Sequence, residues 1–248
     1  ESNQILKIKK LISKLSSTDS RVLISGPTGS GKELVARKIH KNSNRSKNPF
    51  IVMNGALLQS DNYENELFGS ENKDGSVSYG FLEKASNGTL LIDEVSEIPL
   101  DTQAKILRVL IDQKFKRING TKDINVNIRI ISSTSKDLKS EVTIGNFRED
   151  LYHRINVVPI EIPKLSSRPD DIPILINYFQ KKISEINGIP EIKLNVDEEL
   201  LYSYDWPGNV RELRNLVERI SILSQNENKS NITRLLNEIL NKNSTQNL

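Results

Sequence analysis

A glycine-rich segment that ends in a lysine has the clearest capacity for chemistry in this chain. It reads Gly26, Pro27, Thr28, Gly29, Ser30, Gly31, Lys32 and Glu33, and it follows an apolar run at residues 22–24. Glycines let the backbone curl so that successive N–H groups converge on one anion, and a helix starting there adds its positive dipole end. Lys32 would then reach the terminal phosphates of a nucleoside triphosphate. This phosphate loop is therefore a predicted nucleotide site, although glycine-rich turns with a lysine also occur as plain loops.

Two carboxylates elsewhere in the chain complement the phosphate loop. The strict form of the motif places Ser or Thr after the lysine to hold Mg²⁺, and this chain has Glu33 there. Asp93 and Glu94 follow an apolar run at residues 90–92, and ligands of open parallel sheets bind at the carboxyl ends of the strands. We expect Asp93 to hold Mg²⁺ with the help of water, and Glu94 to orient and polarise an attacking water. A solvated acidic turn is the alternative interpretation.

Composition excludes several other classes of function. The 248 residues are 36% hydrophobic, which is enough for a sizeable core, and the net charge of +3 is too small to argue for nucleic-acid binding by this segment. Without cysteine there are no disulfides or thiolate metal sites, and two isolated histidines do not suggest a zinc site. We find no membrane-spanning run or export signal and expect a cytoplasmic protein. Because the chain starts at Glu1, we expect a fragment of something longer.

The order of elements predicts an α/β core followed by helices. β-Branched runs, which predict strands, lie at residues 21–25, 50–53, 89–92, 127–132 and 157–162. Strands that alternate with helical patterns predict a parallel sheet covered on both faces. Beyond residue 168 the pattern is helical, with helices expected from residue 172, over 196–203 and from 209 to 223. We therefore expect an α/β domain at residues 1–163, a small helical domain at 164–224 and a linker at 225–248.

Five motifs in a fixed order resemble the AAA+ domain of bacterial enhancer-binding proteins, the NtrC-type activators of sigma-54 RNA polymerase. They lie at residues 26–33, 66–69, 88–94, 147–152 and 206–213. The similarity covers residues 11–223, and the last two motifs are highly specific in combination. It implies a P-loop NTPase core with a helical lid, and ATP and Mg²⁺ as cofactors. It also implies that Leu34, Thr134 and Arg211 contact the nucleotide together with the phosphate loop.

The resemblance assigns roles to several single residues. Asn54 matches an amide that restrains the catalytic glutamate, and its side chain could donate a hydrogen bond to Glu94. Thr134 matches the first sensor, but the family usually continues with Asn where this chain has Ser135, which puts a second sensor contact in doubt. Arg211 matches the second sensor in the lid, and a partner for Glu212 or Glu218 is the alternative. Asn54 could also be a simple strand-end turn residue.

Two arginines match the fingers that reach the nucleotide of the next subunit in an AAA+ ring. They are Arg148 and Arg154, and an arginine supplied in trans neutralises charge that develops on the phosphoryl group. If both lay on one helix they would point about 240° apart, so one of them would bridge the interface instead. Surface salt bridges are the alternative for either. Near the lid motif, Asn209 is a natural helix N-cap, and Trp206 is expected in the core.

One segment departs from the family pattern. After residues 66–69 the family carries a loop with Gly-Ala-Phe-Thr-Gly-Ala, which grips sigma-54, whereas residues 70–80 here are shorter and contain nothing similar. Tyr79 is the only aromatic residue in this segment. The absence resembles the NtrX-type response regulators of two-component systems. In such a protein a receiver domain, served by a sensor histidine kinase, would precede this chain, and a DNA-binding domain would follow it.

The resemblance leaves the use of ATP open. We expect an ATP-binding and ATP-hydrolysing domain that forms a ring-like homo-oligomer, a hexamer or heptamer, through trans arginine fingers. Because the gripping loop is missing, we do not expect sigma-54 activation, and contact with RNA polymerase is left undecided. A sigma-54 activator and a nucleotide-dependent oligomerisation module without significant turnover are the alternatives. A generic AAA+ loader or replication initiator is disfavoured by the specific motifs.

Overall fold

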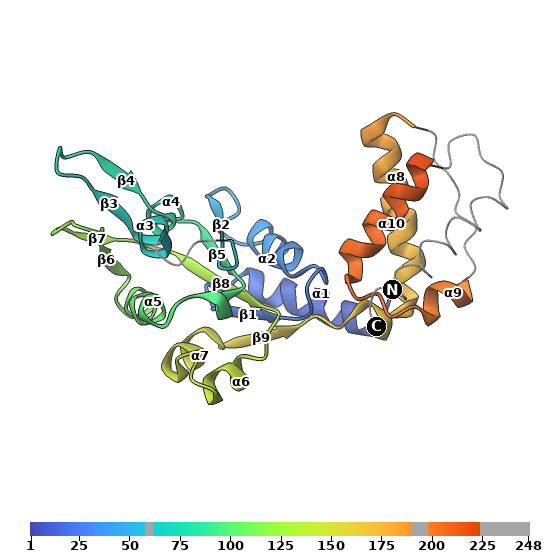
Figure 1. Cartoon of the computed structure of the whole chain (residues 1–248), viewed down its shortest axis with the longest axis horizontal. Helices are drawn as coiled ribbons and strands as arrows, with labels where there is room; N and C mark the ends of the chain where they lie inside the picture. The colour runs from blue at the N-terminus through green and yellow to red at the C-terminus, as the bar shows by residue number, and fades with distance from the viewer. Residues whose placement is uncertain (58–61, 190–197, 224–248) are drawn as a thin grey trace. The chain divides into compact units, whose positions relative to one another are not determined.

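The computed structural model describes residues 1–57, 62–189 and 198–223 (Figure 1). The chain forms two compact units. The first, here called the α/β unit, contains Lys7–Pro27 and Lys32–Ile162. The second, the helical unit, contains Glu1–Leu6, Thr28–Gly31 and the chain from Pro163 onward. The middle of the phosphate loop therefore makes its contacts with the helical unit, although both of its ends belong to the α/β unit.

A five-stranded parallel sheet forms the centre of the α/β unit. Its strands, in spatial order, are β2 (Phe50–Asn54), β5 (Thr89–Asp93), β8 (Arg129–Thr134), β1 (Val22–Ser25) and β9 (Val158–Glu161). Every neighbouring pair is parallel. All five expected strands form, and the largest difference is that β8 begins and ends two residues later than expected. The predicted parallel sheet is confirmed.

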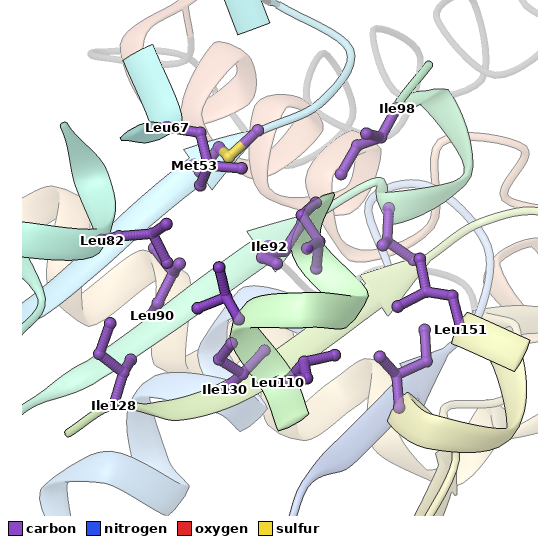
Figure 2. Close-up of a cluster of buried hydrophobic side chains, with 14 of the residues drawn as sticks. Met53, Leu67, Leu82, Leu90, Ile92, Ile98, Leu110, Ile128, Ile130 and Leu151 are labelled. Atoms are coloured by element: carbon purple, nitrogen blue, oxygen red, sulfur yellow. The ribbon is translucent and has the colours of Figure 1, made fainter. Parts of the chain in front are cut away.

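Apolar side chains alternate between the two faces of this sheet. Along β5, Leu90 and Ile92 enter one core cluster, while Leu91 enters another on the opposite face. The first cluster lies under α3, α4, α5 and α7, and Figure 2 shows Met53, Leu82, Leu90 and other members packed against one another. The second lies under α1 and α2. A strand that is buried on both faces is largely apolar, which explains the continuous apolar run at residues 90–92.

The helices and hairpins around this sheet have the following bounds. The helices are α1 (Asn3–Ser16), α2 (Lys32–Lys41), α3 (Tyr63–Phe68), α4 (Phe81–Lys84), α5 (Leu100–Asp112), α6 (Leu138–Thr143) and α7 (Glu149–Ile155), with a short 3₁₀ turn η2 (Val95–Glu97). Two antiparallel hairpins pair β3 (Gly69–Glu71) with β4 (Val77–Tyr79), and β6 (Lys114–Lys116) with β7 (Asp123–Asn125). The hairpins meet through a bridge between Ser70 and Ile118.

The helical unit has its own apolar core. It contains η3 (Leu165–Ser167), η4 (Pro169–Asp171), α8 (Ile172–Asn187), α9 (Glu198–Ser203) and α10 (Asn209–Leu223). Trp206 is 1% exposed in this core, as expected, and its indole Nε1 donates to the Leu201 carbonyl at 3.0 Å. The expected helices from 172 and 209 are confirmed. The first residues of the expected 196–203 helix and the expected linker at 225–248 lie outside the described part of the chain. No helix among the described residues is long and apolar enough to cross a membrane.

Candidate functional site

Lys32 connects the phosphate loop to the carboxyl ends of the central strands. The loop leaves β1, with the Gly26 N–H donating to the Thr134 carbonyl at 3.2 Å, and α2 begins at Lys32. The Lys32 side chain is 6% exposed, and its Nζ lies 3.1 Å from Glu94 Oε1 and 3.0 Å from the Gly26 carbonyl. The expected meeting of Lys32 with the carboxylates after β5 is therefore present in the structure.

Serines from β8 and its end hold both of these carboxylates. Ser133 Oγ donates to Asp93 Oδ1 at 2.5 Å. Glu94 stands at φ = 52°, a left-handed conformation that turns the chain away from the sheet, and its Oε2 accepts from both the N–H and the Oγ of Ser135 at 2.8 Å. Burial raises the pKa of Glu94, but the Ser135 hydrogen bonds and the Lys32 ammonium outweigh it, so the pKa is lowered. Glu94 is thus kept as an ionised, oriented carboxylate.

Asn54 and Thr134 are the last residues of β2 and β8. Asn54 Nδ2 is 3.5 Å from Asp93 Oδ2, and its Oδ1 accepts from the Ala56 N–H at 2.9 Å. Its partner among the described residues is therefore Asp93 rather than the expected Glu94. Thr134 is buried and donates towards Ser96 and the Lys136 carbonyl, while the contact to Glu94 comes from the next residue, Ser135. Ser135 stands where the family usually has Asn, and a sensor contact of this residue with a nucleotide stays a prediction.

Within the helical unit, three successive carbonyls of the phosphate loop receive hydrogen bonds. Asn209 Nδ2 donates to the Thr28 carbonyl at 3.1 Å, the Arg211 N–H to the Gly29 carbonyl at 3.2 Å, and Arg168 Nη2 to the Ser30 carbonyl at 3.2 Å. These hydrogen bonds fix the orientation of the peptide groups in the middle of the phosphate loop. Gly29 has φ = 77°, and a Cβ there would lie 2.3 Å from the Gly208 carbonyl oxygen, so glycine is required.

The phosphate loop has the features of an anion cradle. Ser30 Oγ is buried and has no hydrogen-bond partner among the described residues. Such an orphaned hydroxyl is a donor that a bound oxygen anion would satisfy. Glu33, by contrast, is not placed as a metal ligand, because its carboxylate forms an ion pair with Arg37 one turn later on α2 at 2.7 Å. No cluster of three or more His, Cys, Asp or Glu that could hold a metal occurs in the described ranges.

Of the two candidate finger arginines, Arg154 lies on α7 and Arg148 lies just before its first residue. Arg148 is the N-cap residue of α7, in extended conformation, rather than a residue of the helix, so the expected angle between two helical arginines was wrong. Its guanidinium pairs with Asp150 at 2.8 Å on the surface. Arg154 lies on α7, donates weakly to the Leu110 carbonyl at 3.5 Å, and has a buried Nε without a partner in the described structure. The Arg211 side chain is exposed.

Asn209 does not cap its helix as expected. Its Oδ1 accepts the N–H of Leu165 at 2.8 Å, and its φ of 52° is left-handed. The start of α10 is instead capped by Glu212, whose Oε2 accepts the Gly208 N–H at 2.8 Å. The carboxamide is used to join the start of η3 to the phosphate loop, because it can accept and donate at once.

The segment at residues 70–80 forms the tight β3–β4 hairpin. Arg117, in the turn between β6 and β7, donates to both oxygens of Glu83 at 2.7 and 2.6 Å and to Glu71 at 2.8 Å. Its guanidinium carbon also lies 5.4 Å from the centre of the Tyr79 ring. Glu71 belongs to β3 and Glu83 to α4, so one cation ties both sides of this segment to the neighbouring hairpin (Figure 1).

Sequence reasoning missed three residues of this arrangement. Ser133, Arg168 and Arg117 belong to no motif that we singled out for chemistry. Their partners lie between 34 and 138 positions away in the chain, so no local spacing indicates them. Only the position of Ser133 at the carboxyl end of an expected strand was an available signal.

Comparison with protein families agrees with this geometry. Residues 1–161 match the model described as the sigma-54 interaction domain. The chain belongs to the sigma-54 interaction domain family. Residues 166–248 match the AAA+ ATPase lid domain, so the P-loop core and helical lid inferred from the five motifs are confirmed in this member of the family.

Curated relatives of this sigma-54 interaction domain are bacterial regulators. The chain is 45% identical over 234 residues to the nitrogen assimilation regulatory protein NtrX of Azorhizobium caulinodans, covering 94% of this chain and 52% of that protein. It is 46% identical over 223 residues to a putative response regulator NtrX-like protein of Rickettsia felis, covering 88% of this chain and 46% of that protein. The chain thus spans about half the length of these relatives.

Solved structures support the same assignment. NtrX from Brucella abortus matches with a TM-score of 0.87 at 45% identity, over 92% of this chain and 53% of that one. Further structures of that protein are described as complexes with ATP and with ADP, and they match with the same TM-score.

Proposed function

We propose that this chain is the ATP-binding and ATP-hydrolysing central domain of a two-component response regulator. The observation that carries the proposal is the contact of Lys32 with Glu94, beside Asp93, at the carboxyl ends of the central strands. Support comes from the NtrX structures of Brucella abortus, which are described as complexes with ATP and ADP. The chain spans about half the length of its relatives. We therefore propose, in addition, that a full-length protein would carry a receiver domain, served by a sensor kinase, and a DNA-binding domain.

In the proposed reaction each residue has a separate task. The loop N–H groups and Lys32 bind the phosphates. The Glu94 carboxylate accepts a proton from a water molecule while the oxygen of that water bonds to the γ-phosphorus. The bond from that phosphorus to the bridging oxygen breaks, giving ADP and phosphate. Asp93 fits a Mg²⁺ ligand, since Mg²⁺ takes one or two carboxylates and otherwise phosphate and water. Within the described ranges, Asp93 Oδ2 has only the long 3.5 Å contact to Asn54. Bound there, Mg²⁺ would neutralise phosphate charge.

The proposal includes assembly of several copies. Arg148 lies on the surface of the α/β unit and holds only an exposed pair with Asp150, which costs little to exchange for a phosphate of a neighbouring copy. Arg154 carries a buried N–H without an acceptor in the described chain. The exposed pair of Arg148 favours an arginine that acts in trans, Arg154 is assigned to the interface by the family resemblance, and Arg211 would report the nucleotide from the lid.

The proposed regulator does not activate sigma-54. Residues 70–80 lack the gripping sequence, and the β3–β4 hairpin is tied down by Arg117. The match to a sigma-54 interaction domain supports the alternative of an activator. Binding of sigma-54 in the presence of a transition-state analogue of ATP separates the two, because a stable complex would refute our proposal.

An ATPase assay over a series of protein concentrations tests the proposal. We expect a turnover rate per subunit that rises with concentration, loss of nucleotide binding in Lys32→Ala, and loss of turnover with retained binding in Glu94→Gln. Lys38→Ala, an exposed lysine on the same helix, is the matched control and should bind normally. Undiminished binding by Lys32→Ala would remove the phosphate-loop assignment. Binding without turnover would favour the oligomerisation module.

A further inference from the structure

We propose that Arg168 orients the phosphate loop for nucleotide binding, and that Asp171 and Ser2 hold Arg168 in place for this task. This inference rests on the proposed binding of ATP, and it adds a line of contacts that begins at the start of α1 and ends in the loop. Every member of this line belongs to the helical unit, namely Ser2, Asp171, Arg168 and Ser30. Arg168 is a positioning residue, because it contacts the backbone of the loop rather than the nucleotide.

Arg168 acts on the peptide bond between Ser30 and Gly31. Arg168 Nη2 donates to the Ser30 carbonyl at 3.2 Å, and no peptide bond of the described chain is cis. In a trans peptide the N–H points away from the C=O, so this hydrogen bond also sets the direction of the Gly31 N–H. Gly31 has φ = 107°, and the freedom of glycine would otherwise allow this peptide to rotate. A rotated peptide would present its carbonyl oxygen to a bound phosphate in place of its N–H.

A carboxylate that is itself held by Ser2 keeps Arg168 in place. The Ser2 N–H donates to Asp171 Oδ1 at 2.7 Å, and the Ser2 hydroxyl donates to Asp171 Oδ2 at 2.8 Å. Asp171 Oδ2 in turn lies 3.7 Å from Arg168 Nη1. Ser2, Asp171 and Arg168 are each only 5–6% exposed, so water competes little for these contacts. Because the Ser2 carbonyl also accepts the Leu6 N–H at 3.1 Å, the first turn of α1 is connected to the phosphate loop.

A purely structural role for Arg168 would be to stabilise the helical unit through its ion pair with Asp171. The hydrogen bond from the guanidinium to the loop is 3.2 Å long, whereas the pair with Asp171 spans 3.7 Å. Arg168 Nε has no acceptor among the residues that the structure describes. Burial lowers the pKa of Arg168 more than Asp171 raises it, so this cation is kept buried at a cost to stability. Its contact with the loop therefore explains the buried cation better than the ion pair does.

The orientation of this peptide can be observed directly by NMR without nucleotide. When serine carries a ¹³C carbonyl and glycine carries ¹⁵N, only the two Ser-Gly peptides of the chain, at residues 25–26 and 30–31, give a carbonyl-to-amide signal. The peptide at 25–26 is the internal reference, because its neighbours are Ile162 and Thr134 rather than Arg168. The main variant combines Arg168→Met with Asp171→Asn, which removes the donor and leaves neither partner as an unpaired buried charge.

Three single variants accompany the double variant. Ser2→Ala removes one hydroxyl and disturbs the fold least. Asn3→Ala is its matched control, since Asn3 is the exposed next residue. Ile176→Val is the control for stability, because Ile176 is 5% exposed in the core of the same unit and has no contact with the line from Ser2 to the loop among the described hydrogen bonds. Urea unfolding followed by Trp206 fluorescence measures the stability of each variant, and titration calorimetry measures its Kd for ATP.

In the double variant we expect the signal of the 30–31 peptide to move, the signal of the 25–26 peptide to stay, and the Kd for ATP to rise about tenfold, because one charge-assisted hydrogen bond is lost. Ser2→Ala should move the same signal in the same direction and raise the Kd about threefold. Asn3→Ala should change neither quantity. Ile176→Val should lower stability and leave the Kd and both signals unchanged.

An unmoved 30–31 signal in the double variant would overturn the inference, and so would a Kd that rises no more than in Ile176→Val, because Arg168 would then serve only stability. An unchanged Kd in Ser2→Ala would overturn the part assigned to Ser2. If the parent protein binds no ATP, the proposed function fails, while the 30–31 signal of the nucleotide-free protein still decides whether Arg168 orients the loop.

Discussion

Replacement of Asn209 by alanine should damage both the helical unit and the phosphate loop. Asn209 is 2% exposed, and its carboxamide accepts the Leu165 N–H at 2.8 Å and donates to the Thr28 carbonyl at 3.1 Å. Its backbone has φ = 52°, which asparagine tolerates better than alanine does. Asn209→Ala therefore removes two hydrogen bonds. It also places alanine in a left-handed conformation without the polar side chain that lets asparagine adopt it.

The magnitude follows from these losses. Leaving the buried Leu165 N–H without an acceptor costs about 1–3 kcal/mol, and the left-handed conformation costs alanine about 1 kcal/mol. We expect the free energy of unfolding of the helical unit to fall by about 2–4 kcal/mol. Trp206 is the only tryptophan of the chain and lies in the core of this unit, so its fluorescence during urea unfolding reports the loss directly.

Two further variants separate the causes. Asn209→Gly removes the same hydrogen bonds but suits a positive φ, so it should be more stable than Asn209→Ala by about 1 kcal/mol. Asn209→Asp keeps an acceptor for Leu165 and loses the donor to Thr28, so it should keep most of the stability and bind ATP more weakly. A loss below about 0.5 kcal/mol in Asn209→Ala, the range of ordinary surface substitutions, would refute this account of the site. So would ATP affinity unchanged in Asn209→Asp.

Three other outcomes are expected. Met53→Ala opens a cavity in the core of Figure 2 and should lower the free energy of unfolding of the α/β unit by about 2–5 kcal/mol, measured by urea unfolding followed by far-UV circular dichroism. Arg117→Met strips Glu71 and Glu83 of their shared cation and should cost about 1–2 kcal/mol in the same assay, with faster proteolysis of the β3–β4 hairpin. Because the pKa of Glu94 is lower in the folded protein than in the unfolded chain, its ionised carboxylate stabilises the fold. This stabilisation is complete above the unfolded-state pKa and is lost as pH falls through the folded-state pKa. Glu94→Gln should therefore lose less stability in acid than the parent protein does, measured by urea unfolding over a pH series.

The sheet and the meeting of Lys32 with the carboxylates could be predicted because local patterns determine them. A central strand must be apolar on both faces, and residues that follow neighbouring parallel strands share one edge. The five successive residues 90–94 predict both features, because three apolar residues indicate a central strand and the two carboxylates follow at its end. The helices from 172 and 209 were equally visible, since their apolar residues recur at helical spacing.

The hydrogen bonds that shape the site could not be predicted. Serine is common at strand ends and in loops, so nothing in the sequence separates Ser133, which donates to Asp93, from any other serine until β8 lies beside β5. Asn209 was misread as an N-cap because the local preference of asparagine at helix starts is real, but a long-range contact with Leu165 uses its oxygen instead. Arg148 was placed inside α7 because the sequence does not distinguish a capping residue from the first turn of a helix.

Arg117 changes how the missing gripping loop is interpreted. The sequence shows only that residues 70–80 lack the gripping motif. That is equally compatible with a disordered segment that folds when another protein binds it. In the structure, Glu71 at one end of the segment and Glu83 just after it both pair with the guanidinium of Arg117. The backbone of Ile118 also forms hydrogen bonds with the backbone of Gly69 and Glu71. Lifting such a hairpin would break several charge-assisted hydrogen bonds at once, each worth more than a neutral one. A segment tied at both sides is suited to a fixed surface rather than to a lever moved by ATP, which favours a regulator that uses its nucleotide for assembly.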